Sequence, residues 1–184
     1  MRLYLVRHAE AEPQAEHDSA RALTELGMAQ AQASAEWLCR QIAAPVQIFC
    51  SPYLRARQTA EILQQALAVP VLTQVDELIP EGDLLRAEQA ISLAMQGGAE
   101  ALVVVSHMPL LATLESWLVE GVLGTGQPFS LAEVRISMGD MLAPGLLIRE
   151  EGFVPVVDPG NSPLDELKAL LARHLPLPGG GSAS

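Results

Sequence analysis

Basic and nucleophilic side chains follow three apolar, strand-like runs in this sequence. With their polar ends, the runs read "LYLVRH" (Arg7, His8), "IFCSPYLR" (Ser51, Arg55) and "LVVVSH" (Ser106, His107). A neutral imidazole is a competent nucleophile toward phosphorus, and arginine offers planar, paired N–H donors that fit phosphate oxygens. These residue types together indicate phosphoryl-group chemistry, for which no metal ion or other cofactor is needed.

Two histidines and two arginines are the candidate catalytic residues. His8 directly follows Arg7 at a strand end, so we expect His8 to attack the phosphoryl group and to carry it as a covalent intermediate. His107, from another strand end, is expected to donate a hydrogen bond to the phosphoryl oxygens as charge develops on them. Arg7 and Arg55 are expected to bind the phosphate. A single strand-end histidine is more often structural, and it is the pairing of two with arginines that favours catalysis.

Other polar residues have simpler structural interpretations. Arg57 lies four residues before Glu61, which is the spacing of an exposed ion pair on a helix. Ser51 is expected to cap the helix that follows it, with Pro52 at the first helical position. His17 and His174 lie in polar or terminal segments, and we expect both on the surface.

The elements that must position these residues alternate between strand and helix. Strands are expected at 2–6, 46–50, 70–72 and 101–105, and helices at 24–43, 51–68, 84–96 and 109–119. Shorter strands are expected at 130–138, 144–149 and 153–157, before a terminal helix at 163–174. This order is typical of an α/β fold with three αβα layers and a mostly parallel central sheet. Ligands bind outside the carboxyl ends of such strands, so the three polar strand ends should face one crevice.

Composition limits the class of protein. The 184 residues are 49% hydrophobic and 18% charged, so we predict one folded domain over 1–175 and a flexible Gly/Ser-rich tail over 176–184. A formal net charge of −11 argues against nucleic-acid and membrane partners. Cys39 and Cys50 match neither a disulfide framework nor a zinc site, and we recognise no signal peptide or membrane span. We therefore predict a cytoplasmic protein.

The three motifs resemble those of the histidine phosphatase superfamily, also called the phosphoglycerate mutase-like family. Its Arg-His-Gly signature stands here as Arg7-His8-Ala9, its Ser-Pro-x-x-Arg-Ala-x-Gln-Thr-Ala motif as 51–60, and its second histidine as Ser106-His107. The small size of the chain and the segment "ARALTELG" (20–27) are similar to the SixA-type phosphohistidine phosphatases. The resemblance implies a phosphoglycerate mutase-like fold, a phosphorylated His8, and a phosphate pocket formed by Arg7, Arg55 and His107.

Two further expectations follow from this resemblance. Arg21 would be an additional phosphate or substrate contact, with a solvent-facing loop arginine as the alternative. Ala9 stands where the family usually has glycine. If that position needs a positive φ, alanine costs stability; if it needs only close approach, alanine is nearly as small as glycine.

The leaving group separates the possible substrates. An alkoxide needs a proton donor, whereas a protonated imidazole leaves readily. Segment 75–83 offers Glu77 and Glu81 as acids, but neither lies in a context that compels this role, and the connections are too short to form a lid. We therefore predict a phosphohistidine phosphatase that acts on a signalling or phosphotransfer protein, such as a histidine phosphotransfer domain. The alternatives are a small-molecule phosphomonoesterase of the same superfamily with Glu77 as the acid, a mutase, and a non-catalytic phosphate-recognition module.

Overall fold

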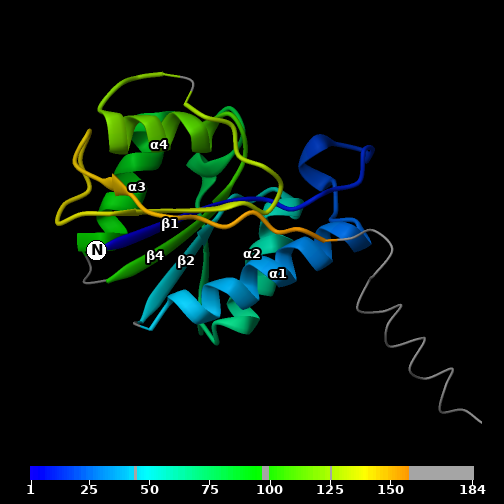
Figure 1. The fold of residues 1–184 in the computed structure, drawn as a ribbon. Coiled ribbons are helices and arrows are strands. Elements are labelled where there is room, and N and C mark those ends of the chain that lie inside the picture. Colours follow the sequence, from blue (N-terminus) through cyan, green and yellow to red (C-terminus); the bar gives the residue numbers. More distant parts are fainter. Residues whose placement is uncertain (44, 97–99, 125, 158–184) are drawn as a thin grey trace, which may run out of the picture.

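Six strands form one central sheet in the structure, a computed structural model that describes residues 1–43, 45–96, 100–124 and 126–157 (Figure 1). The strands are β1 (Arg2–Arg7), β2 (Val46–Cys50), β3 (Leu72–Gln74), β4 (Ala101–Ser106), β5 (Val134–Met138) and β6 (Ile148–Arg149). Their order across the sheet is β3-β2-β4-β1-β5-β6. The pairs among β1 to β4 are parallel, and β5 is antiparallel to both of its neighbours. The mostly parallel sheet is thereby confirmed.

Strand register places the predicted site residues at one edge of this sheet. Arg7, the last residue of β1, pairs with Ser106 at the end of β4. Cys50, the last residue of β2, pairs with Val105 of β4. The polar residues that follow β1, β2 and β4 therefore emerge next to one another.

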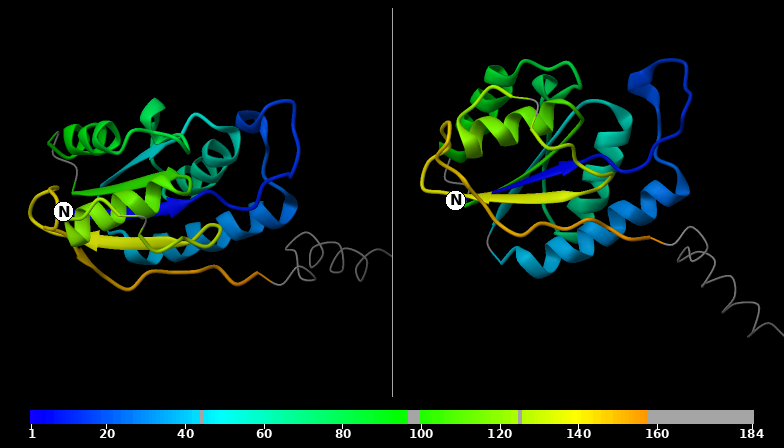
Figure 2. Two further views of the ribbon diagram at one scale, coloured as in Figure 1. Left: turned by 90° about the horizontal axis from the view of Figure 1, so that it is seen from above. Right: turned by 45° about the horizontal axis from the view of Figure 1, so that its top comes forward.

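Helices cover both faces of the sheet, so the fold has the three expected layers (Figures 1 and 2). They are α1 (Glu25–Gln41), α2 (Leu54–Ala66), α3 (Leu84–Gln96) and α4 (Leu110–Glu120), with 3₁₀ turns η1 (Asp18–Ala20) and η2 (Asp76–Leu78). Because strand side chains alternate between faces, Leu3 and Leu5 pack under α3 and α4, whereas Tyr4 and Val6 pack against α1 and α2. Within the described residues, no helix has the length and apolarity needed to span a bilayer.

A close contact ties α1 to the chain that leaves β1. The predicted N-cap is confirmed, because Thr24 Oγ1 accepts a hydrogen bond from the Gly27 backbone N–H at 2.9 Å. The Thr24 hydroxyl also donates to Glu10 Oε1 at 2.9 Å. A Cβ on Gly27 would collide with the carbonyl oxygen of Glu10, so this position needs glycine for close approach. The segment after His8 is thus held against the first turn of α1.

Several expected elements differ in the structure. The third strand is Leu72–Gln74 and not 70–72, and the strands expected at 130–138 and 144–149 are shorter, at Val134–Met138 and Ile148–Arg149. Helix α2 begins at Leu54 with Tyr53 as its N-cap, so Ser51-Pro52 is not its start. The reason lies in Ser51 itself, which is fully buried and whose hydroxyl lies against His107. Segment 153–157 is not a strand: only Phe153 pairs, in an isolated bridge with Val134, and its ring stacks on Trp37.

Some expectations fall on residues outside the described part of the chain. These are the terminal helix at 163–174, which includes His174, and the tail at 176–184. The extent of a single domain over 1–175 stays a prediction for the same reason.

Candidate active site

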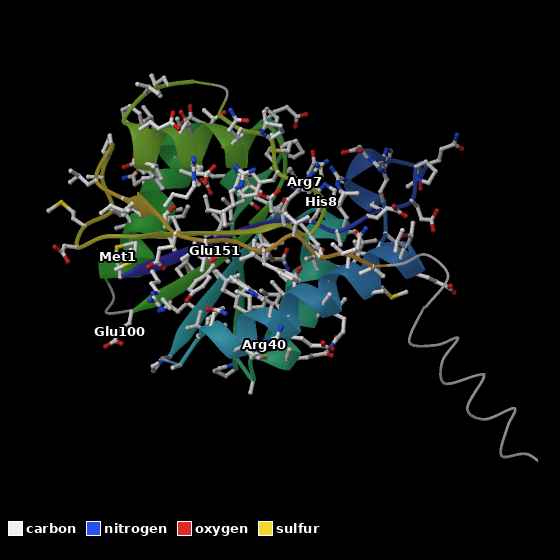
Figure 3. All side chains as sticks on the ribbon, in the orientation of Figure 1. Met1, Arg7, His8, Arg40, Glu100 and Glu151 are labelled. Atoms are coloured by element: carbon white, nitrogen blue, oxygen red, sulfur yellow. The ribbon has the colours of Figure 1, made fainter. Side chains whose placement is uncertain are left out.

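One pocket collects all of the residues that the sequence singled out for phosphate chemistry. It has a volume of about 420 Å³ and lies at the carboxyl ends of β1, β2 and β4. The predicted residues Arg7, His8, Arg21, Arg55 and His107 line it, together with Glu10, Ala11, Asp18, Pro80, Glu81, Met108 and Leu131. Figure 3 labels Arg7 and His8 at this end of the molecule, with Met1 and Glu100 at the other. The predicted convergence of three strand ends is therefore a feature of the fold.

Hydrogen bonds define the protonation of His8. Its backbone N–H donates to the carbonyl of Ser106 at 3.0 Å, which fixes the residue at the end of β4. Its Nδ1 lies 2.7 Å from the carbonyl oxygen of Ala9. Because a carbonyl only accepts, Nδ1 carries the hydrogen and Nε2 presents a lone pair. Arg55 Nε donates to this Nε2 at 3.3 Å. The atom suited to attack phosphorus is therefore Nε2.

His8 is neutral over most of the pH range. Burial, and then the positive charges of Arg55, Arg7 and Arg21, lower its pKa from 6.5 to about 4. Neutrality at pH 7 is what a nitrogen nucleophile requires.

The acid limb of kcat/KM should accordingly report a low pKa. Protonation of Nε2 removes the lone pair, so activity will be lost only as the pH falls toward about 4, and not near 6.5. An NMR titration of the His8 ring, assigned by its loss in His8→Ala, measures the same group without substrate. A His8 midpoint near 6.5 would contradict this electrostatic picture.

His107 lies beside His8, with 5.0 Å between the ring centroids. It is almost fully buried, and burial together with its histidine neighbour lowers its pKa, so it too is neutral. Ser51 Oγ lies 2.8 Å from His107 Nε2 and accepts the Tyr53 backbone N–H at 3.3 Å. This hydroxyl makes no other hydrogen bond with the described residues, so we assign its hydrogen to Nε2 and the ring hydrogen of His107 to Nδ1. Among the described residues, nothing accepts from this buried Nδ1.

Ser51 therefore matters for the tautomer of His107. We expect Ser51→Ala to lower kcat/KM about tenfold, because Nδ1–H would no longer be enforced as a donor. Ser116→Ala is the matched control, since Ser116 is a buried serine of α4 that donates to Glu120 Oε2. Equal losses in the two variants would show a general packing effect in place of a tautomer effect.

Two of the three pocket arginines share Asp18 as a partner, and the third is held by a backbone carbonyl. Arg7 Nη1 donates to the carbonyl of Phe129 at 2.7 Å, and among the described residues its buried Nε has no partner. Arg55, which is 4% exposed, donates from Nη1 and Nη2 to the carbonyl and a carboxylate oxygen of Asp18 at 2.7 and 2.9 Å. Arg21 donates to the other Asp18 oxygen at 3.0 Å and to the carbonyl of Glu12. Arg21 is thus part of the pocket wall and not a free loop arginine.

Asp18 is the pocket residue that the sequence did not single out. Its carboxylate bridges Arg21 and Arg55, whose hydrogen bonds hold its pKa below the usual value although partial desolvation opposes this shift. The available signal was its position three residues before Arg21, a spacing that puts two side chains on one side of a helical turn. In a turn of three residues this signal is weak.

Ala9 fits its position without strain. It is fully buried, does not have a positive φ, and donates its N–H to Thr59 Oγ1 at 3.1 Å. Its side chain packs among Leu23, Ala31 and Ala132. Close approach, and not a left-handed backbone, is therefore the requirement here, and alanine meets it.

The remaining sequence expectations divide as follows. Arg57 forms the expected ion pair with Glu61 at 3.4 Å, and His17 is exposed. Of the two acid candidates, Glu81 lines the pocket. Glu77 belongs to the 3₁₀ turn η2 and is not among the residues that line the pocket, so the assumption of Glu77 as the acid in the phosphomonoesterase alternative has no support from this pocket.

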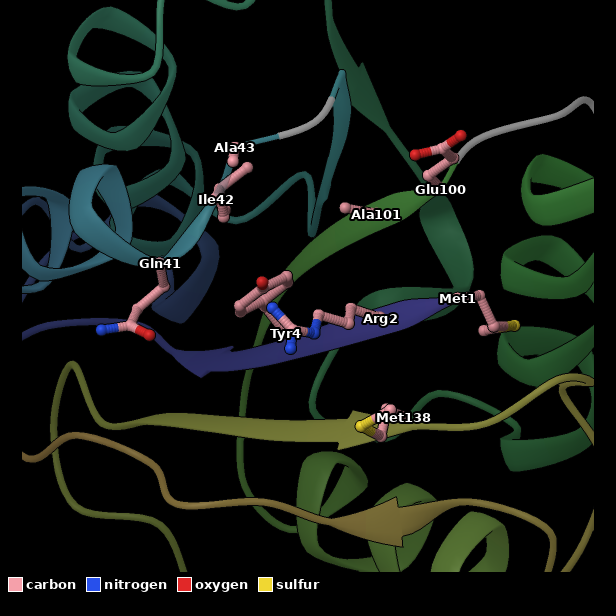
Figure 4. Close-up of a pocket in the computed structure, with 9 residues that line it drawn as sticks. All are labelled: Met1, Arg2, Tyr4, Gln41, Ile42, Ala43, Glu100, Ala101 and Met138. Carbon is pink, nitrogen blue, oxygen red and sulfur yellow. The ribbon is translucent and has the colours of Figure 1, made fainter.

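A larger cavity, of about 570 Å³, lies at the opposite end of the sheet (Figure 4). It is lined by Met1, Arg2, Tyr4, Gln41, Ile42, Ala43, Glu100, Ala101 and Met138. These residues include the amino-terminal ends of β1 and β4. Ligands of such sheets bind beyond the carboxyl ends of the strands, which lie on the other side of the molecule. Arg2 and Glu100 are its only charged side chains, and this lining has no histidine. The smaller pocket around His8 is therefore the candidate active site.

Comparisons with known proteins agree with this geometry. Residues 3–91 match the histidine phosphatase superfamily (branch 1). The chain is 33% identical over 122 residues to the phosphohistidine phosphatase SixA of Escherichia coli (strain K12), an alignment that covers 66% of this chain and 76% of that protein. A solved structure of the protein histidine phosphatase SixA complexed with tungstate has a TM-score of 0.76 and 27% identity, covering 84% of this chain and 97% of that one. A putative phosphohistidine phosphatase SixA from Agrobacterium tumefaciens has a TM-score of 0.67 and 27% identity, with coverage of 84% and 98%. Similarity of this extent, in sequence and in fold together, means that the chain belongs to the histidine phosphatase superfamily.

Proposed function

We propose that this protein is a phosphohistidine phosphatase that acts on a signalling or phosphotransfer protein through a phosphorylated His8. The observation that carries the proposal is the state of His8: a neutral, buried imidazole with its Nε2 lone pair facing the pocket arginine Arg55. The names of the similar SixA proteins support the same substrate class.

The first step transfers the phosphoryl group to the enzyme. His8 Nε2 forms a bond to phosphorus while the bond from phosphorus to the partner's imidazole nitrogen breaks, and that imidazole leaves with the electron pair. The ring of His8 gains positive charge, which the hydrogen bond from Nδ1 to the Ala9 carbonyl stabilises. Arg7 and His107 line the pocket, and Arg7 Nε and His107 Nδ1 have no partner among the described residues, so we assign both as donors to the oxygens of the group in transit.

The second step regenerates the enzyme. A water oxygen attacks phosphorus, the bond to His8 Nε2 breaks, and the electron pair returns to Nε2. The water protons leave with inorganic phosphate and the solvent. His8 and His107 end in the neutral forms that their lowered pKa values favour at pH 7.

Two of the three pocket carboxylates are engaged by other side chains, which favours phosphohistidine over an ester. Glu10 accepts from the Thr24 hydroxyl, and Asp18 is paired with both Arg21 and Arg55. Neither is available as a proton donor for an alkoxide. A leaving imidazole does not need one once its ring is protonated.

A small-molecule phosphomonoesterase is the second candidate, because the exposed Glu81 lines the pocket and is not engaged by the described side chains. Glu81→Gln would then remove most ester hydrolysis while leaving phosphohistidine hydrolysis intact. As partner we propose a protein such as a histidine phosphotransfer domain, which presents its histidine to an accessible pocket. We also propose a cytoplasmic location, which suits the two free cysteines.

A rapid-quench mass measurement tests the proposed function. A phosphorylated histidine phosphotransfer domain is mixed with wild-type enzyme and with His8→Ala, and intact masses of both proteins are followed. We expect a transient gain of one phosphoryl group on the wild type only, as the partner loses its phosphoryl group, followed by release of inorganic phosphate from the enzyme. Faster hydrolysis of phosphoserine than of the phosphoprotein would favour the esterase. A stable phosphoprotein without any phosphoenzyme would favour a recognition module.

A further inference from the structure

Arg135 is a strand residue outside the pocket. It forms hydrogen bonds with loop 127–129, and this loop in turn accepts a hydrogen bond from the pocket arginine Arg7. Arg135 lies on β5, opposite Leu5 of β1, and its side chain reaches Glu115 of α4. Its Nη1 donates to the carbonyl of Gln127 at 3.0 Å and its Nη2 to the carbonyl of Pro128 at 2.6 Å. One guanidinium thus holds two successive carbonyls of this loop.

The next residue of the loop connects this grip to the pocket. The Arg135 guanidinium lies over the Phe129 ring, with 3.8 Å between Cζ and the ring centroid. The carbonyl of Phe129 accepts the hydrogen bond from Arg7 Nη1 at 2.7 Å. Phe129 is 2% exposed and belongs to the hydrophobic core, and Arg135 covers its ring. Arg7 is therefore oriented by a carbonyl whose place depends on Arg135.

Carboxylates complete the arrangement around Arg135. Glu133 Oε1 accepts from Arg135 Nε at 2.6 Å, and its other oxygen accepts the Ser130 backbone N–H. Glu115 of α4, whose side chain is fully buried, accepts from Arg135 Nη1 at 2.6 Å and from Arg149 Nε at 2.8 Å. The paired charges fix the guanidinium plane in one orientation, which an ammonium group cannot reproduce.

We propose that Arg135 is a positioning residue for phosphoryl transfer: by clamping loop 127–129 it orients the Arg7 guanidinium through the Phe129 carbonyl. The expected effect of Arg135 on turnover rests on the proposed function. Its expected effect on phosphate binding is independent of that function. Lysine at position 135 keeps the charge beside Glu115 but loses the planar grip on both carbonyls. A simple ion-pair role would therefore survive Arg135→Lys, and the positioning role would not.

The test uses Arg135→Lys in the full chain, with inorganic phosphate as the probe. We expect the dissociation constant of phosphate to rise about tenfold and KM for the phosphoprotein to rise with it. In arginine-¹⁵N-labelled protein, the Nε–H resonance of Arg7, assigned by its loss in Arg7→Lys, should shift before any phosphate is added. Arg149→Gln is the control, because it also loses a bond to Glu115, and Arg149 makes no hydrogen bond or ion pair with the described loop residues 127–129. That variant should keep phosphate binding within about twofold of the wild type.

Each outcome has one meaning. If Arg135→Lys and Arg149→Gln have the same dissociation constant for phosphate and the same Arg7 Nε–H resonance, the proposed role of Arg135 is wrong. If Arg135→Lys fails to fold, Phe129→Leu removes the stacking surface and retains the carbonyl, and an unshifted Arg7 resonance in that variant overturns the proposal. If the wild-type protein binds phosphate but does not hydrolyse phosphohistidine, the proposed function is wrong, and the positioning role of Arg135 in phosphate binding is unaffected.

Discussion

Replacing His8 by alanine is expected to lower kcat for a phosphohistidine protein by at least about 10⁴-fold, which is the usual scale for loss of a catalytic nucleophile. The reason is chemical: the covalent step needs the Nε2 lone pair, and His107, 5.0 Å away between ring centroids, has its own Nε2 beside Ser51. Single-turnover kinetics with the phosphorylated partner measure this loss directly.

The fold and the phosphate pocket should survive this change. His8 is buried and neutral, so alanine leaves no unpaired charge behind. We expect unchanged secondary structure and phosphate affinity within about tenfold of the wild type, since the arginines remain. His17→Ala is the control, because His17 is exposed and its side chain faces Glu16. Turnover by His8→Ala above about 1% of the wild-type rate would assign the nucleophile to another group.

Arg55→Met is the second large effect, with an expected loss of about 10³-fold in kcat/KM. Arg55 combines two contacts that methionine cannot make: its Nε donates to His8 Nε2, and its Nη groups hold Asp18. Its loss removes positive charge where the phosphoryl group is bound and frees the Asp18 carboxylate beside it. Both changes disfavour an anion, so KM should rise as kcat falls.

Arg57→Met controls for this prediction on the same helix. Arg57 is half-exposed and pairs with Glu61, and an exposed pair of this kind contributes little to stability. We expect activity within about twofold of the wild type. Stopped-flow measurement of kcat and KM for both variants separates the effects on binding and on chemistry. Similar losses in the two variants would mean that general surface charge, and not the pocket, drives phosphate capture.

Much of the fold followed from local patterns. The bounds of β2 and α3 are the ones predicted. An apolar run and a helical period are each strong signals, and residues that commonly end such elements flank both. The pocket histidines and arginines followed from one topological rule, since parallel strands present their carboxyl ends together. The rule needs only parallel strands, and the alternation of strand and helix indicated these; the order of the strands across the sheet was not predicted.

Other parts depend on contacts between distant residues and left no local pattern. Ser51 looks like a helix cap in sequence, and only the position of His107 in space shows why its hydroxyl is used elsewhere. Asp18 and Arg55 are 37 positions apart, so their ion pair has no signature in spacing. Segment 153–157 has strand-like composition, but Val156 is 94% exposed and pairs with nothing among the described strands.

The register of β1 links folding quality to chemistry in this protein. Leu3 and Leu5 face one helix layer and Tyr4 and Val6 face the other, so sliding β1 by one residue against β4 would exchange the two sets. The same slip would carry His8 out of reach of the His107 ring. All four of these β1 side chains are buried and differ in size and shape, so a slipped β1 would pack poorly against both helix layers. The packing that stabilises this strand therefore also sets the position of the nucleophile.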